Sequence, residues 1–129
     1  MLKGKEFWAH LCENLEYRFF AGVPFKEALG LYGSMNIDIM HYVPAANENI
    51  AVKLAAGALI SGFKSAVILD SKLIDKVDLS FHTKYELPIL FISNFKPAGK
   101  EFLISNDIDE LVNEIETSNR PGVFVIGEE

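Results

Sequence analysis

The sequence predicts an α/β protein of the three-layer α/β/α class, built on a mostly parallel, doubly wound sheet of five or six strands. Two observations lead to this fold class. Segments with strand character alternate with segments of helical periodicity along all 129 residues. Several of the strands are unbroken apolar runs, which is typical of strands buried on both faces of a parallel sheet. No internal repeat, low-complexity segment or linker interrupts the pattern, so residues 1–129 are expected to form a single domain.

The first third of the chain predicts two helices and two strands in alternation. Apolar residues at helical spacing predict a first helix over residues 6–17. The run RFFAGV predicts a strand over residues 18–23. Pro24 then suits the first turn of a helix over residues 24–35. The β-prone residues 41–43 form the second strand.

The central third contains a helix of unusual composition. Asn47 is a good N-cap, and Glu48 then falls in the first helical turn, where the helix dipole favours a carboxylate. Residues 50–60 are apolar nearly all round and rich in small side chains, so we expect this helix to be buried on every side. Gly62 ends it as a C-cap glycine, and the apolar run AVIL at residues 66–69 is a buried strand. Glu48 is therefore the one charged residue at the N-terminal end of this apolar helix.

The remaining elements continue the alternation. The predicted helices cover residues 71–85 and 107–119, and the predicted strands cover residues 88–93 and 121–126. Residues 94–100 form a loop, and residues 102–104 are a short strand or extended chain. Asp107 caps the last helix, whose acidic side chains face outward.

Composition and charge exclude several classes of function. Half of the residues are hydrophobic and the mean hydropathy is +0.18, which favours burial of some apolar surface against another chain. The net charge of −6 argues against nucleic acid and anionic membranes as partners. No apolar run reaches the roughly 20 residues of a membrane span, and the start lacks the features of a signal peptide. The single cysteine, Cys12, fits a reducing, cytoplasmic location.

Other candidate motifs carry less information. GALISGFKS at residues 57–65 comes close to a phosphate-binding loop, but it lies at a helix end, where phosphate would meet carbonyl groups. His10, His41 and His82 have no metal-ligand spacing, so we interpret each as structural or solvent-facing, and we predict no metal ligand in this chain. Glu48 has two interpretations. It is either a carboxylate that complements the helix dipole or a desolvated carboxylate that handles protons.

Two stretches of the chain together resemble the pyrimidine-binding domain of thiamine diphosphate-dependent enzymes. They are GVPFKEAL at residues 22–29 and VPAANENIAVKLAAGALISG at residues 43–62. The likeness is to the alpha subunit of sulfopyruvate decarboxylase and to phosphonopyruvate decarboxylase, and it covers essentially the whole chain. It implies the fold of that domain. It also implies a thiamine diphosphate-dependent carboxy-lyase that acts on a small 2-oxo acid similar to sulfopyruvate or phosphonopyruvate.

The resemblance also implies the site residues. Glu48 matches the glutamate that hydrogen-bonds N1′ of the cofactor's aminopyrimidine and so favours the tautomer whose 4′-nitrogen can take a proton. Gly22 and Pro24 match the turn that approaches this ring. Asn47 matches the residue that orients the strand-to-helix junction, and Ser71 keeps the serine of a family segment after the next strand.

Two positions depart from the family pattern, and one motif is missing. Phe25 stands where the decarboxylases have an aspartate that works on substrate protons, and Lys72 stands where they have a glycine. No G-D-G motif followed by an asparagine occurs to hold magnesium and the diphosphate. The resemblance therefore implies half an active site. Thiamine diphosphate, with Mg²⁺ held by the partner, would be shared with a separate diphosphate-binding subunit in a hetero-oligomer. The chain alone would form a self-dimer.

Two alternatives stay open from the sequence. The chain is a degenerate, non-catalytic subunit with a role in assembly or regulation, or it is an unrelated flavodoxin-like module that binds a small ligand. In the second case Glu48 is only a helix-start residue. The sequence also leaves open whether Lys26, Lys72 or His82 contacts substrate.

Overall fold

The computed structural model describes residues 4–98 and 102–126, and these residues form a six-stranded sheet with the order β2-β1-β3-β4-β6-β5. Every pairing between these strands is parallel. The strands are β1 (Tyr17–Gly22), β2 (His41–Pro44), β3 (Lys64–Ile68), β4 (Leu90–Ser93), β5 (Leu103–Ser105) and β6 (Gly122–Val125). The predicted α/β class and parallel sheet are confirmed, and the predicted strand bounds lie within one or two residues of those observed.

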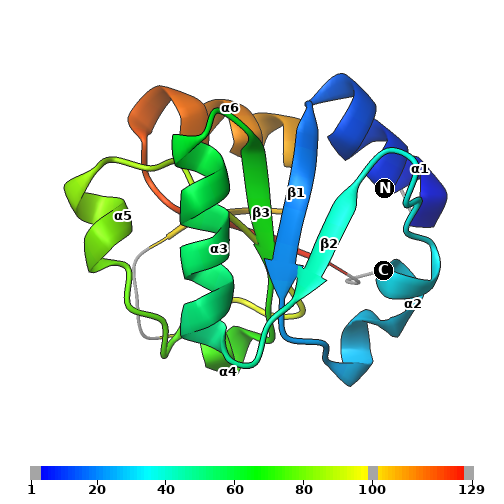
Figure 1. Cartoon of the computed structure of the whole chain (residues 1–129), viewed down its shortest axis with the longest axis horizontal. Coiled ribbons are helices and arrows are strands. Elements are labelled where there is room, and N and C mark those ends of the chain that lie inside the picture. Colours follow the sequence, from blue (N-terminus) through cyan, green and yellow to red (C-terminus); the bar gives the residue numbers. More distant parts are fainter. Residues whose placement is uncertain (1–3, 99–101, 127–129) are drawn as a thin grey trace.

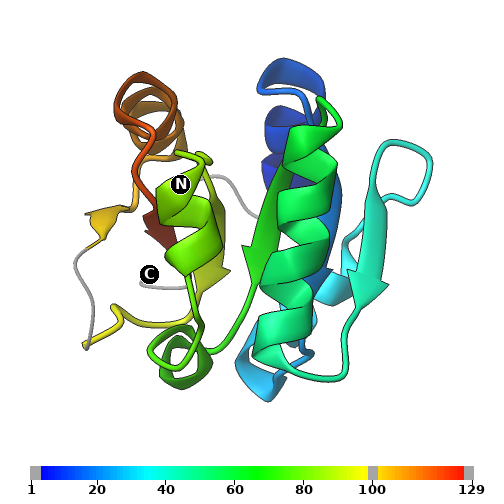
Figure 2. The ribbon, with the colours of Figure 1, turned by 60° about the vertical axis from the view of Figure 1, so that its left-hand side comes forward.

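Helices cover both faces of this sheet and give the molecule three layers (Figures 1 and 2). One face carries α1 (Gly4–Ala9), the π-helix η1 (His10–Asn14), α2 (Leu29–Gly33) and α6 (Ile108–Ser118). The other face carries α3 (Glu48–Ile60), α4 (Ser71–Ile74) and α5 (Ser80–Lys84).

Two apolar clusters form the core, one on each face of the sheet. Alternate residues of β4 belong to different clusters, since Leu90 and Ile92 face α6 while Phe91 lies in the cluster under α3. Trp8 of α1 is fully buried, and its ring nitrogen donates a hydrogen bond to the carbonyl oxygen of Leu31 at 2.9 Å. This bond ties α1 to α2 across the first face.

The first predicted helix is too long at its end. The helical segment stops at Asn14, and Tyr17 belongs to β1. Glu16 has a left-handed backbone with φ of 68°, which breaks the helix before the strand begins. Tyr17 is 2% exposed, so burial of its ring in the sheet outweighs the local helical spacing.

The predicted helix over residues 24–35 is also shorter than expected. Phe25 is extended, with φ of −140° and ψ of 153°, so Pro24 is not a helical residue. A 3₁₀ turn, η2 (Lys26–Ala28), precedes α2. The extended Phe25 places its ring against Tyr32, and this contact delays the start of the helix.

The predicted helix over residues 71–85 is divided into α4 and α5. Asp78 breaks it, because its carboxylate accepts hydrogen bonds from the amide and the hydroxyl of Ser80 at 3.0 and 2.7 Å. The amide of Asp78 in turn donates to the side-chain oxygen of Asn49 on α3 at 2.9 Å. Aspartate commonly forms such local bonds in preference to helix, and apolar spacing does not detect them.

The central helix is capped as predicted, but it is not buried on all sides. Its buried residues are Ala51, Val52, Ala55 and Ala56. Ile50, Leu54 and Ile60 are 42, 37 and 61% exposed, since α3 is an outer layer and only one of its faces meets β1 and β3. At its end, the amides of Gly62 and Phe63 donate to the carbonyls of Leu59 and Ala58, which forms a Schellman motif around the left-handed Gly62.

The last part of the chain matches the predictions closely. The extended segment at residues 102–104 is the short edge strand β5, and Asp107 caps α6 by accepting from the amide of Glu110 at 3.2 Å. The predicted loop over residues 94–100 contains no helix or strand up to Ala98, and its last two residues lie outside the described part. None of the helices in the described part of the chain has the length and apolar composition needed to cross a bilayer.

Candidate functional site

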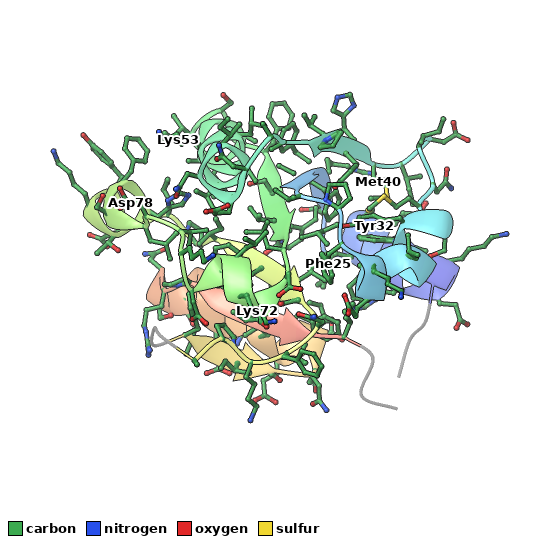
Figure 3. The ribbon with its side chains drawn as sticks, turned by 90° about the horizontal axis from the view of Figure 1, so that it is seen from below. Phe25, Tyr32, Met40, Lys53, Lys72 and Asp78 are labelled. Carbon is green, nitrogen blue, oxygen red and sulfur yellow. The ribbon has the colours of Figure 1, made fainter. Side chains whose placement is uncertain are left out.

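The five predicted site residues all follow the carboxyl ends of three neighbouring strands. Gly22 ends β1 and Pro24 follows it, Asn47 and Glu48 follow β2, and Ser71 follows β3. Because β2, β1 and β3 are adjacent and parallel, these positions lie along one edge of the sheet, here called the carboxyl edge. Figure 3 views the molecule from this side, with Phe25 and Lys72 labelled on the segments that follow β1 and β3.

The strand order reverses at this part of the carboxyl edge. The chain passes from β1 to β2 on one side and then crosses back to β3 on the other side of β1. The two connections therefore run over opposite faces, with α2 on one and α3 on the other. In open α/β sheets a reversal of this kind leaves a crevice outside the strand ends, and ligands commonly bind there.

Gly22 allows β1 and β3 to approach closely at this point. A β-carbon at position 22 would lie 2.2 Å from the carbonyl oxygen of Ile68. The carbonyl of Gly22 also accepts a hydrogen bond of 2.7 Å from the amide of Ala45, which holds the β2–α3 junction against β1. Gly22 thus has a structural role that its match to a cofactor-binding turn did not reveal.

Asn47 and Glu48 begin α3 at the carboxyl edge. The side-chain oxygen of Asn47 accepts a hydrogen bond from the amide of Ile50 at 2.9 Å, so the predicted N-cap is confirmed. Glu48 is the first helical residue and is half-buried. Within residues 4–98 and 102–126, no side chain or backbone group donates a hydrogen bond to its carboxylate. The carboxylate can therefore accept a hydrogen bond from a ligand.

Ser71 is buried at the start of α4, where a residue missed by the sequence analysis supports it. The amide of Ser71 donates to the side-chain oxygen of Asn94 at 3.0 Å. Asn94, directly after β4, also accepts a hydrogen bond of 3.2 Å from the hydroxyl of Ser93 and is only 9% exposed. The signal available in the sequence was a Ser-Asn pair immediately after an apolar strand. Asp70 caps the same helix by accepting from the amide of Lys72 at 2.9 Å.

Phe25, the residue that directly follows Pro24, is part of an aromatic cluster. Its ring lies 6.5 Å from that of Tyr32 in an edge-to-face arrangement, and both residues are labelled in Figure 3. The rings of Tyr32 and Tyr42 are 5.7 Å apart. Burial raises the pKa of both tyrosines above the ordinary value. These hydroxyls therefore stay protonated at neutral pH, and the cluster supplies packing in place of an acid or base.

The remaining chemically active side chains are separated from one another. Nε2 of His10 lies 2.7 Å from the carboxylate of Asp109, His41 is exposed, and Nε2 of His82 lies 3.2 Å from the carbonyl of Val52. Burial raises the pKa of the Cys12 thiol to about 11, so it is unreactive at neutral pH, as expected of a core residue. The described residues contain no group of three or more histidine, cysteine or acidic side chains that could hold a metal.

Three of the hollows lined by described residues contain none of the predicted site residues. The largest of these three, of about 630 Å³, lies farther along the carboxyl edge at the ends of β4, β5 and β6. The other two have volumes of about 450 and 110 Å³ and lie beside η1 and beside α5.

Comparison with known protein families found no family model that matches the chain, and comparison with curated proteins found no match either. The fold and the carboxyl edge therefore define the class of protein. It is a three-layer α/β protein whose parallel sheet reverses order beside a half-buried glutamate at a helix start.

Proposed function

We propose that this chain is the pyrimidine-binding subunit of a thiamine diphosphate-dependent decarboxylase. The substrate would be a small 2-oxo acid similar to sulfopyruvate or phosphonopyruvate. The observation that carries the proposal is the position of Glu48, a half-buried carboxylate with no described internal partner at the reversal of strand order. Glu48 is also the residue that the resemblance to pyrimidine-binding domains assigns to the cofactor.

The residues at this edge fit an aminopyrimidine ring. Glu48 would hold a proton on the ring nitrogen, and its partial burial keeps that proton from exchange with bulk water. The close approach of β1 and β3 at Gly22 fixes the backbone before the turn that would contact the ring. When bound, thiamine diphosphate accepts the electron pair that the carboxylate of a 2-oxo acid releases as it leaves as carbon dioxide. Asn47 and Ser71 would position the ring from the two flanking strand ends.

A partner subunit is part of the proposal. Mg²⁺ and the diphosphate would be held by that subunit, since the described residues of this chain offer no metal-ligating cluster. The outer face of α3, which begins at Glu48, supports a partner because it exposes Ile50 and Leu54 at successive turns. An exposed apolar helix face next to an incomplete site is the arrangement expected where two chains share a ligand.

A second candidate function is a non-catalytic subunit of the same fold, which assembles with or regulates the enzyme. The observation that favours it is the packing of Phe25 against Tyr32, because the side chain at this position cannot move protons. If the chain is instead the pyrimidine-binding subunit of an active decarboxylase, a residue of the partner subunit would transfer the proton to the substrate.

The test is a Glu48→Gln substitution in the assembled complex. We expect the complex, recovered with a partner that carries a G-D-G motif and a following asparagine, to decarboxylate a 2-oxo acid. Glu48→Gln should lower the turnover at least about a hundredfold, the lower end of the contribution of a positioned proton-transfer group. Full activity in the variant would overturn the proposal.

The matched control is Glu110→Gln, which removes an exposed carboxylate from the first turn of α6. Each substitution removes one negative charge near a helix N-terminus. A ligand role is therefore assigned to Glu48 only if turnover falls in Glu48→Gln and stays unchanged in Glu110→Gln. A complex that binds thiamine diphosphate without turnover would favour the non-catalytic subunit. If the purified chain is a stable monomer and does not respond to thiamine diphosphate when any partner is added, the result would favour an unrelated small-ligand module.

A further inference from the structure

The hollow at the far end of the carboxyl edge has the dimensions of a small-molecule site. Its volume is about 630 Å³, within the range of sites that bury a ligand of moderate size. Among the residues that the structure describes, its lining comes from three strand ends: Phe95, Lys96, Ile104, Ser105, Asn106 and Val125.

The strand order reverses a second time at this hollow. The chain passes from β4 to the edge strand β5 and then returns through α6 to place β6 between them. α6 covers the face that carries α1, whereas the described residues of the β4–β5 connection contain no helix. The opposite face of β5 and β6 is thus left with less cover, which explains why a hollow forms there. In the sheet, β3 lies between the strands that border this hollow and the strands β1 and β2, whose ends lie near Glu48.

Hydrogen bonds hold both walls of the hollow in place. On one side, the side-chain oxygen of Asn94 accepts a hydrogen bond from the amide of Ser71. The amide of Ala98 donates to the carboxylate of Asp75 at 3.1 Å. Phe95 and Lys96 therefore lie between two anchored positions.

On the other side, the hydroxyl of Ser105 accepts from the amide of Asp107 at 2.9 Å. Between the walls, the amide of Ile126 donates to the carbonyl of Ser93 at 2.8 Å and joins the ends of β6 and β4. A site built this way is largely formed before a ligand arrives.

The lining combines apolar walls with one positive charge. Phe95 and Ile104 are 57 and 37% exposed, although both belong to residue types that favour burial. Lys96 is the one charged side chain among the six lining residues. Nearby Asp107 directs its carboxylate to the amide of Glu110, as the cap of α6. The lining therefore favours a ligand that has both a flat apolar part and a negative charge.

We propose that this hollow binds a small aromatic anion, with its ring against Phe95 and Ile104 and its carboxylate or phosphate group at Lys96. Asn106 supplies a polar group that orients such a ligand, whereas the hydroxyl of Ser105 is bonded to the backbone of Asp107. The inference does not depend on the function proposed for Glu48, because the two sites share no residue.

Titration of the full chain with phenyl phosphate, followed by amide NMR signals, tests the proposal. We expect saturable shifts of the Lys96, Ser105 and Asn106 signals. Phenol, which lacks the charge, and inorganic phosphate, which lacks the ring, should each bind at least about tenfold more weakly. Benzoate in a parallel titration distinguishes a carboxylate from a phosphate as the preferred anion.

Two substitutions and one control complete the test. Phe95→Ala and Lys96→Met should each weaken the binding of phenyl phosphate at least about fivefold while leaving the rest of the spectrum unchanged. Phe63→Ala is the matched control, because Phe63 is 58% exposed, against 57% for Phe95, and lies outside the hollow. The proposal is overturned if neither aromatic anion gives saturable shifts, if the shifts lie elsewhere, or if Phe63→Ala weakens binding as much as Phe95→Ala.

Discussion

The backbone of Gly22 in β1 lies against the carbonyl group of Ile68 in β3, so that a β-carbon on residue 22 would come within 2.2 Å of the carbonyl oxygen. Both strands are central in the sheet, and β1 is also paired with β2 on its other side. Neither backbone can move aside without disturbing a third strand. The position of the turn that follows β1 is therefore set by the absence of a side chain.

Gly22→Ala is expected to destabilise the protein by about 3 kcal/mol, the upper range for an added methyl group in a packed interior. Urea unfolding followed by circular dichroism measures this change. Gly57→Ala is the control, because a β-carbon there meets no atom within 4 Å and alanine favours a helix. It should stabilise the protein by about 0.5 kcal/mol or more. Equal stability of Gly22→Ala and wild type would contradict the close approach.

Asn47→Ala removes the side chain that accepts the hydrogen bond from the amide of Ile50. The expected loss is about 1 kcal/mol in the free energy of unfolding, as for other helix N-caps. Asn47→Asp retains the acceptor and should keep the stability within about 0.5 kcal/mol of wild type. A similar loss in both variants would show that the side chain acts through some contact other than the cap.

Phe25→Asp introduces the residue found at this position in the pyrimidine-binding domains that the sequence resembles, but it places a carboxylate in the cluster around Tyr32. We expect a loss of about 2 kcal/mol or more, because an aromatic contact is removed and a charge loses part of its hydration. Phe25→Leu, which keeps the apolar contact, should cost less than about 1.5 kcal/mol. Thermal unfolding compares the two. An Asp variant as stable as the Leu variant would mean that position 25 tolerates an acid, and a gain of turnover in the complex would then be interpretable.

His82 is expected to make stability depend on pH. Burial lowers its pKa in the folded state, and this effect outweighs the hydrogen bond to Val52 and the charge of Asp78, which act in the opposite direction. The unfolded chain therefore binds a proton more readily, so stability falls as pH drops below the unfolded value of about 6.5. One such group changes the free energy of unfolding by at most about 1.4 kcal/mol per pH unit.

This contribution is measured by comparing the unfolding free energies of wild type and His82→Gln. The comparison covers pH 5 to pH 7.5 in steps of about half a unit. The Gln variant should have a shallower pH dependence over this interval. Parallel curves for wild type and His82→Gln would contradict the role of burial.

Local signals predicted much of the fold correctly. Apolar runs located the strands, and the caps at Asn47 and Asp107 located the starts of the two long helices, because each signal acts within a few residues of chain. The same signals failed where a distant contact competes with them. The helix expected over residues 71–85 is broken at Asp78, whose amide bonds to Asn49 in α3, a partner that helical spacing cannot reveal.

For the candidate site, the sequence by itself determined which residues lie at the carboxyl edge, including Glu48 at the first turn of α3. Its pattern of alternating strands and helices requires a parallel sheet, and a parallel sheet brings every strand's carboxyl end to one edge. Only the tertiary structure decided which strand ends are neighbours, that Asn94 supports Ser71, that α3 exposes an apolar face and that a second hollow lies beside Phe95. These features depend on strand order and on contacts between segments far apart in the chain, whereas periodicity and capping describe only neighbouring residues.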